Sequence, residues 1–125
     1  MQPQTEFIQT VLETVNGFGL PWTCTVGPVP TGDGLAFQLG PAQVETMYYD
    51  RRARRVWPLT FCCKAQDKQD GFDVLCALKN GLETLTPYPG GEQFAWEGVR
   101  AGDPEYSGEQ DGHLWSCHVD AVVYY

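Results

Sequence analysis

Residues 43–65, QVETMYYDRRARRVWPLTFCCKA, contain two runs typical of β-strands with a short basic stretch between them. The first run, residues 44–49, is rich in strand-forming residues, and residues 50–52 form the expected turn. The second run, residues 56–65, alternates in polarity, which is typical of a half-buried strand. Its predicted inward face consists of Trp57, Leu59, Phe61, Cys63 and Ala65. We predict a long β-hairpin whose second arm enters the core and whose charged tip, residues 50–55, projects beyond it.

Two amphipathic helices are predicted, one on either side of this hairpin. The first covers residues 5–15, where apolar residues recur at helical spacing, with Thr5 as the N-cap and residues 16–17 as the end. The second begins within residues 65–70, with Asp67 or Asp70 as its N-cap. Its apolar stripe consists of Phe72, Leu75, Leu78, Leu82 and Leu85.

Further strands are predicted wherever apolar and polar residues alternate, and the segments between them are rich in turn residues. The strands cover residues 22–26, 35–39, 93–99 and 113–125, and the loops cover residues 27–34 and 100–112. The last strand is so regular that we expect it at the centre of its sheet. The order predicts one α+β domain over residues 1–125: a mostly antiparallel sheet of four to six strands, with two helices packed on one face and a long projecting β-hairpin.

The composition is typical of a globular protein, with 42% hydrophobic and 19% charged residues. No apolar stretch approaches the roughly 20 residues that cross a bilayer. Residues 1–6 lack the basic and apolar regions of a signal peptide. We therefore expect an intracellular chain without membrane association.

The five cysteines are expected to be free thiols, because an odd count without a signal peptide argues against a disulfide framework. Periodicity places Cys63, Cys76 and Cys117 at inward positions, where cysteine is typically a small buried hydrophobe. A Cys117–His118 pair is disfavoured, because neighbours on a strand point to opposite faces. His113 shares a face with Cys117, but no third catalytic partner is evident.

Motifs for other chemistry are missing from the sequence. There is no GxSxG, no HExxH and no GxxxxGK[ST], and residues 67–71 fit a helix cap better than a calcium loop. Nothing in the spacing of the 16 acidic residues selects a catalytic pair. We expect no catalytic residue, no metal and no cofactor, and we predict that the chain is not an enzyme.

The charge is divided unevenly along the chain. The net charge is −8, yet four of the eight basic residues are Arg51, Arg52, Arg54 and Arg55. The other 121 residues hold 16 acids and four bases, so their net charge is −12. An acidic body disfavours general binding to nucleic acid. The polarity suits head-to-tail docking of identical subunits, with the basic region of one on the acidic body of the next.

The basic region has three interpretations. It is a solvated hairpin tip, a subunit or partner contact, or a contact for nucleic acid. Arginines beside tyrosines are typical of protein interfaces, whereas the aromatic residues are not interleaved as a stacking platform for bases. The candidate contact residues are Tyr48, Tyr49, Asp50, Arg51, Arg52, Arg54 and Arg55.

Several runs together resemble a known family. They are LAFQL at residues 35–39, YYDRR at 48–52 and WPLTFCCKA at 57–65, followed by an acid-capped helix and a late pair of strands. The chain resembles small minor capsid proteins of siphophages and prophages in Gram-positive bacteria, close to the tail-terminator (tail-completion) family. The similarity spans nearly the whole chain and consists of patterns of strand, turn and helix. It departs from the family at its arginine-rich turn, where the family has a glycine.

The resemblance implies a structural, non-enzymatic role in the virion, with assembly in the bacterial cytoplasm. Such proteins form a ring, commonly hexameric, at the head-proximal end of the tail, where it stops growth of the tail tube and docks the head connector. The implied partners are other copies of the chain, the tail tube protein and head connector proteins, with DNA only as passing cargo. The hairpin arginines would then meet acids of a neighbour, for which residues 103–111 are the first candidates.

Other functions stay open at this stage. A monomeric, prophage-encoded protein-binding module would use the same hairpin to hold a host or phage protein. A head-completion or connector protein has a similar size and a similar sheet-with-helices construction. A small hydrolase is the most distant alternative.

Overall fold

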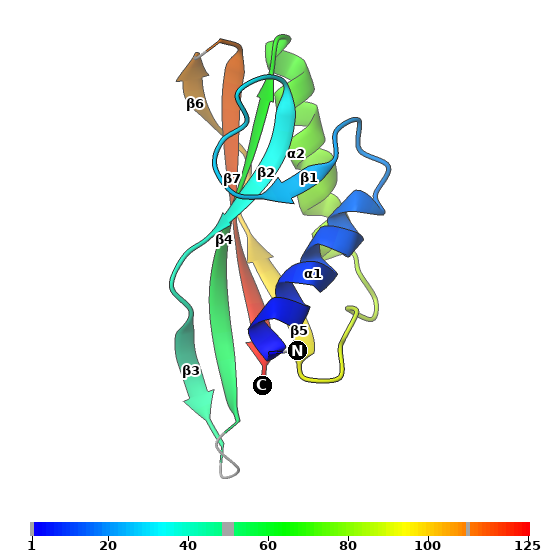
Figure 1. Cartoon of the computed structure of the whole chain (residues 1–125), viewed down its shortest axis with the longest axis vertical. Helices are drawn as coiled ribbons and strands as arrows, with labels where there is room; N and C mark the ends of the chain where they lie inside the picture. The colour runs from blue at the N-terminus through cyan, green and yellow to red at the C-terminus, as the bar shows by residue number, and fades with distance from the viewer. Residues whose placement is uncertain (1, 49–51, 110) are drawn as a thin grey trace.

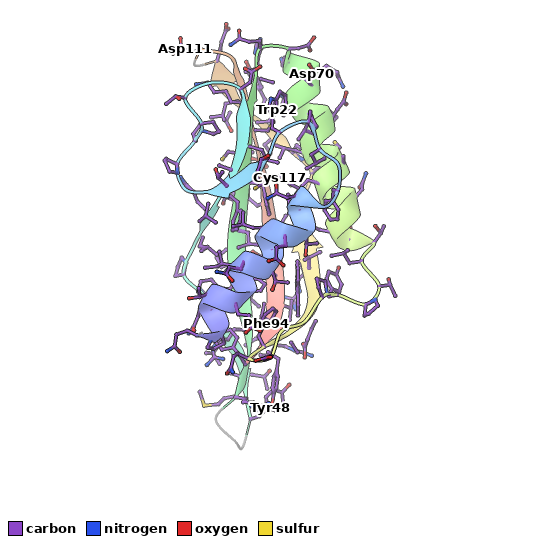
Figure 2. All side chains as sticks on the ribbon, turned by 45° about the vertical axis from the view of Figure 1, so that its right-hand side comes forward. Trp22, Tyr48, Asp70, Phe94, Asp111 and Cys117 are labelled. Carbon is purple, nitrogen blue, oxygen red and sulfur yellow. The ribbon has the colours of Figure 1, made fainter. Side chains whose placement is uncertain are left out.

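The computed structural model describes residues 2–48, 52–109 and 111–125. Within these ranges the chain forms two helices and seven strands (Figure 1). In chain order they are α1 (Pro3–Asn16), β1 (Cys24–Val26), β2 (Gly34–Leu39), β3 (Gln43–Met47), β4 (Ala53–Ala65), α2 (Lys68–Glu83), β5 (Ala95–Ala101), β6 (Glu105–Glu109) and β7 (His113–Tyr124). The molecule is elongated, with Tyr48 near one end of its long axis and Asp70 and Asp111 near the other (Figure 2).

The long strands β4 and β7 form the centre of the sheet and pair antiparallel along their length. Along the edge of β4 that does not pair with β7, the first half of the strand pairs with β3 and the second half with β2. Along the edge of β7 that does not pair with β4, the first half of the strand pairs with β6 and the second half with β5. β1 is parallel to β2, and the other pairings among the described strands are antiparallel. The central position predicted for the last strand is confirmed.

Helix α1 begins at Pro3, two residues before the predicted N-cap, so the prediction of Thr5 as the cap is wrong. Proline suits the first turn of a helix, because the N–H group that it lacks would have no helical partner. The predicted end at residues 16–17 is confirmed. Asn16 then ties the helix to β1: its Oδ1 accepts from the backbone N–H of Cys24 at 2.7 Å, and its Nδ2 donates to the carbonyl of Cys24 at 3.3 Å.

Helix α2 follows Asp67, whose Oδ1 accepts a hydrogen bond from the backbone N–H of Gln69 at 2.9 Å, so the predicted cap at Asp67 is confirmed. The buried leucines of the predicted stripe are Leu75, Leu78 and Leu82. Phe72 is half-buried and packs against the ring of Trp115, with centroids 5.0 Å apart. Leu85 lies beyond the end of the helix.

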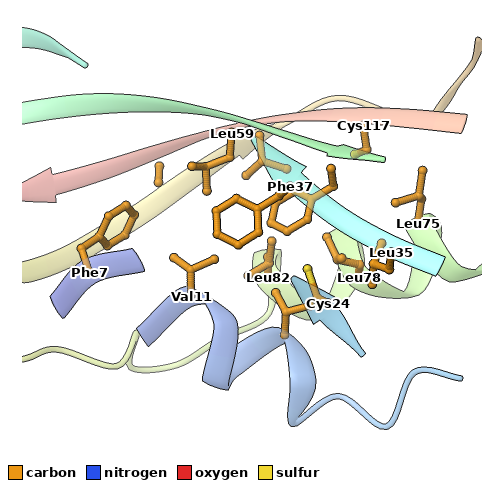
Figure 3. Packing of buried hydrophobic residues seen from close by; sticks show 14 of the residues in the cluster. Phe7, Val11, Cys24, Leu35, Phe37, Leu59, Leu75, Leu78, Leu82 and Cys117 are labelled. Carbon is orange, nitrogen blue, oxygen red and sulfur yellow. The ribbon is translucent and has the colours of Figure 1, made fainter. Parts of the chain in front are cut away.

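Both helices cover the same face of the sheet, and their buried side chains join the inward residues of β2, β4, β5 and β7 in one core (Figure 3). Phe7 of α1, Phe37 of β2 and Phe61 of β4 are all fully buried. The rings of Phe37 and Phe61 lie 5.1 Å apart between centroids. The predicted α+β class, with two helices on one face of a mostly antiparallel sheet, is confirmed, but the described residues form seven strands of the sheet rather than four to six.

The additional strand is β6, which lies within residues 100–112, the segment predicted as a polar loop. Its side chains are almost all exposed, so no alternation of apolar and polar residues marks it. It forms because the first half of β7 offers backbone groups to pair with, and such pairing does not require apolar side chains. Strand β5 also continues to Ala101, beyond the predicted end.

The face of β4 that points away from the helices is more buried than expected for a half-buried strand, since every residue from Phe61 to Ala65 is buried. Lys64, only 6% exposed, directs its Nζ toward the carbonyl oxygens of Pro30 and Thr31, at 3.5 Å from each. The predicted loop at residues 27–34 therefore folds over this part of the sheet, opposite to the helices.

Candidate subunit-contact surface

The predicted contact residues gather where β3 meets the start of β4. Those within the described residues are Tyr48, Arg52, Arg54 and Arg55. Those outside the described residues are Tyr49, Asp50 and Arg51. The backbone N–H of Tyr48 donates to the carbonyl of Arg52 at 2.8 Å, which continues the pairing between β3 and β4. β3 is exposed along its whole length, and no other described strand pairs with its outer edge.

The prediction that residues 50–55 all project as a charged tip is wrong for Arg54 and Arg55. Both residues belong to β4 and pair through their backbones with β7. Ala53, directly before them, is fully buried. A basic run resembles a turn in sequence, but strand pairing uses only backbone groups. Long cationic side chains therefore fit on a strand when their heads reach solvent or a partner.

Arg54 is already paired within the chain. Its Nε lies 2.7 Å from Oε2 of Glu97, and the two side chains are 41% and 35% exposed. The hydrogen bond and the charge of Glu97 raise the pKa of Arg54 above its ordinary value. Glu97 is the residue at which the pairing of β5 with β7 shifts register. Its ion pair with Arg54 spans β7, which lies between β5 and β4.

Arg55 has a packing role at the edge of the core. Its guanidinium carbon lies 4.0 Å from the centroid of the Tyr125 ring, a favourable cation–π geometry. The hydroxyl of Tyr125 accepts a hydrogen bond from Nε1 of Trp57 at 2.9 Å. One terminal nitrogen of Arg55, Nη1, is buried and has no hydrogen-bond partner among the described residues. Arg55 is thus packed against Tyr125 at the edge of the core.

The exposed residues that the structure describes at this end differ in part from those predicted. The guanidinium carbon of Arg52 lies 6.0 Å from the centroid of the Tyr124 ring, which in turn meets the Tyr48 ring edge-on, with centroids 5.4 Å apart. Met47 is 66% exposed on β3. We call Met47, Tyr48, Arg52 and Tyr124 the tip surface. Sequence reasoning missed Met47 and Tyr124, since the pairing of β3 and β7 on either side of β4 is what brings them to one end.

A second surface lies between the α1–β1 connector and α2, where the sequence indicated only a connector. It is a cleft of about 520 Å³. We call it the acidic cleft and define it by Phe18, Leu20, Trp22, Asp70, Asp73 and Val74. The close approach of the connector depends on Gly81, because a Cβ atom there would lie 2.8 Å from the ring of Phe18. Trp22 and Asp70 lie toward the end of the long axis opposite Tyr48 (Figure 2).

The cations away from the tip have contacts within the chain. Lys79 lies 2.6 Å from Glu83 and 3.4 Å from Asp103, so one of the acids expected to receive a neighbour's arginine is already paired. Arg100 lies 3.2 Å from Glu45 and joins β5 to β3. The ammonium group of Lys68 lies 4.3 Å from the centroid of the Tyr106 ring.

Four of the five cysteine thiols are buried. All five cysteines are free, and burial raises the pKa of Cys24 and of Cys63 to about 12 and that of Cys117 to about 11. These thiols stay protonated at neutral pH and are therefore poor nucleophiles. The Sγ atom of Cys117 donates to the carbonyl of Gly102 at 3.2 Å. The predicted burial of Cys63 and Cys117 is confirmed, whereas Cys76 is only partly buried.

No family model and no curated protein matches the chain. Across residues 2–48, 52–109 and 111–125, no group of three or more His, Cys, Asp or Glu side chains is arranged to hold a metal ion. Neither of the helices in these ranges is long and apolar enough to cross a membrane.

Proposed function

We propose that the chain is a structural subunit of a phage or prophage virion, a minor capsid protein similar to tail terminators. In this proposal, copies of the chain form a ring at the head-proximal end of the tail. The ring stops growth of the tail tube and docks the head connector. The α+β fold is compatible with the resemblance seen in the sequence, and the tip surface supports a role in protein contact.

The observation that carries the proposal is the exposure of β3. Val44, Met47 and Tyr48 are 51%, 66% and 42% exposed, and all three lie on or directly after this edge strand. A strand edge that carries apolar side chains is a ready surface for another protein chain. Arg52 and Tyr124 add residue types that are enriched at interface centres.

The charge distribution supports contact with protein rather than with nucleic acid. Outside the arginines of residues 51–55 the chain has a net charge of −12, which repels a phosphate backbone. DNA is therefore proposed only as passing cargo. A closed ring needs two different patches on each subunit, because its contacts are heterologous. A cationic tip on an acidic body meets that need.

The first test is the mass of the chain in solution. Light scattering over a concentration series should show association that rises with concentration, and negative-stain images of the largest species should show rings. The double variant Met47→Ser, Tyr48→Ser should shift the association midpoint at least about tenfold to higher concentration, since it removes apolar contact area.

The matched control is Val26→Ser, which removes a similarly exposed apolar side chain, 43% exposed, from β1. It should associate like the wild type. A chain that is monomeric at every concentration would contradict self-assembly of the isolated protein and would favour the monomeric binding module.

A further inference from the structure

The acidic cleft combines an apolar interior with free negative charge. Phe18, Leu20 and Trp22 are half-buried, so part of the surface of each side chain is accessible to a binding partner. Asp70 and Asp73 lie on the first turns of α2 and are exposed. Such a cleft is suited to a partner that presents apolar side chains and a cation together.

The two carboxylates have no basic partner among the described residues. Oδ1 of Asp73 accepts only a neutral hydrogen bond, from Nε2 of Gln69 at 2.9 Å. Lys68, the nearest cation in sequence, directs its ammonium group over the ring of Tyr106 instead. Asp103, by contrast, is already engaged by Lys79. The negative charge at the cleft is therefore less compensated than the charge at Asp103.

The tip surface has the complementary chemistry. Met47, Tyr48 and Tyr124 supply apolar and aromatic area, and Arg52 supplies a cation that is exposed to solvent. The tip and the cleft lie toward opposite ends of the long axis, so they do not meet within one chain (Figure 2). We infer that the acidic cleft receives the tip surface of a second copy of this chain.

This inference rests on the proposed function and names the contact that joins its subunits. Tip-in-cleft docking is heterologous, because each copy uses its tip toward one neighbour and its cleft toward the other. A heterologous contact closes a ring when its rotation returns to the first copy, and it otherwise extends as a filament; the proposed function requires the first case. The apolar side chains supply most of the binding, and the arginine–aspartate contact orients the docking and makes it sensitive to salt.

A charge exchange between two variants tests the contact. Arg52→Glu places a carboxylate on the tip, and Asp73→Lys places a cation at the cleft. Each variant alone brings like charges together and should shift the association midpoint at least about tenfold to higher concentration. In an equimolar mixture, Glu on one tip meets Lys in the other cleft, and the remaining junctions are of the wild-type kind. The mixture should therefore recover association, measured by light scattering.

A variant that fills the cleft with a larger side chain tests the same contact without a change in charge. Ala77→Tyr fills the cleft from an exposed position of α2 and should also weaken association. Gln9→Tyr on α1 and Glu13→Lys on the same helix are the matched controls for size and for charge, because both positions are exposed and neither lines the cleft. Circular dichroism melting curves confirm that each variant is folded.

The outcomes separate this inference from the proposed function. If the wild type associates and the single variants associate equally well, the tip-in-cleft contact is wrong and the proposed ring uses another surface. The same conclusion follows if the mixture does not recover, or if the Ala77→Tyr variant associates normally. If the wild type stays monomeric at every concentration, both the self-assembly and the contact are wrong, and the cleft serves another partner.

Discussion

The two halves of strand β4 have different surroundings. We expect one half to contribute mainly to the stability of the fold and the other mainly to contact with other protein chains. The second half, which contains Phe61, lies in the core beneath the helices. The first half, which contains Arg54, pairs with β3 and β7 and reaches beyond the helices (Figure 1). Side chains of the covered half pack in a common core, whereas in the other half Arg54 pairs with Glu97 and Arg55 packs on Tyr125. Substitutions should therefore change stability in one half and association in the other.

The largest expected effect is on stability in the covered half. Phe61→Ala removes a fully buried ring that packs against Phe37, and it should lower the free energy of unfolding by about 3–5 kcal/mol. Guanidinium unfolding followed by tryptophan fluorescence measures the loss. Tyr48→Ala is the control in the uncovered half and should change stability by less than about 1 kcal/mol. If both variants lost the same free energy of unfolding, the two halves of β4 would contribute equally to stability, which would contradict this comparison.

A smaller effect tests how tightly the connector is held against α2. Alanine normally stabilises a helix by up to about 1 kcal/mol relative to glycine. At Gly81, however, the added methyl group would meet three ring atoms of Phe18 at 2.8–3.1 Å. Overpacking of this kind costs about 1–3 kcal/mol, so Gly81→Ala should be destabilising overall.

Thermal and guanidinium unfolding of Gly81→Ala show whether the substitution raises or lowers the free energy of unfolding. Asn80→Ala, at the preceding exposed position of the same helix, should leave stability unchanged or slightly higher. A gain in stability for Gly81→Ala would show that Phe18 moves aside without cost and that the cleft beside it is not rigid.

The smallest expected effect is a loss of stability at alkaline pH that comes from the buried thiols of the core. The buried thiols of Cys24 and Cys63 have a pKa of about 12 in the folded chain against 9.0 for an unperturbed cysteine. Below pH 9 both states keep the proton, and above it the unfolded chain loses protons that the folded chain retains. The free energy of unfolding should therefore fall as the pH rises above 9, and the fall should continue toward pH 12.

Urea unfolding between about pH 8 and pH 10 measures the slope. The double variant Cys24→Ala, Cys63→Ala should show a shallower slope than the wild type. Cys76→Ala, which alters a partly exposed thiol, should change the slope less. An unchanged slope in the double variant would mean that alkaline instability comes from other groups, such as tyrosines.

The inward faces in the covered half could be predicted, because each strand or helix there has its own periodic pattern of apolar residues. The alternation in residues 56–65 and the stripe at Leu75, Leu78 and Leu82 correctly placed the inward faces of β4 and α2. Asp67 has the side chain that an N-cap requires, and it is the cap. These signals are local, since each depends on residues a few positions apart.

The uncovered half and the candidate contact were predictable only in part. The sequence predicted Tyr48, Arg52, Arg54 and Arg55 as contact residues, and it gave no sign that Arg54 and Arg55 lie on β4 and contact Glu97 and Tyr125. Those partners are 43 and 70 positions away in the sequence, where no periodicity connects them. The acidic cleft was missed for the same reason: Trp22 and Asp70 come together only when the connector packs on α2.

The α+β class, the inward faces of both helices and of the long strands, and the excess of acid around one basic segment could all be inferred from the amino-acid sequence. These properties follow from composition and from periodicities of two and 3.6 residues. The strand β6, the burial of Lys64 and the open surfaces toward the two ends of the molecule became evident only from the folded chain. Each of these depends on the pairing of segments distant in sequence, in which backbone hydrogen bonds and long-range packing outweigh local preference.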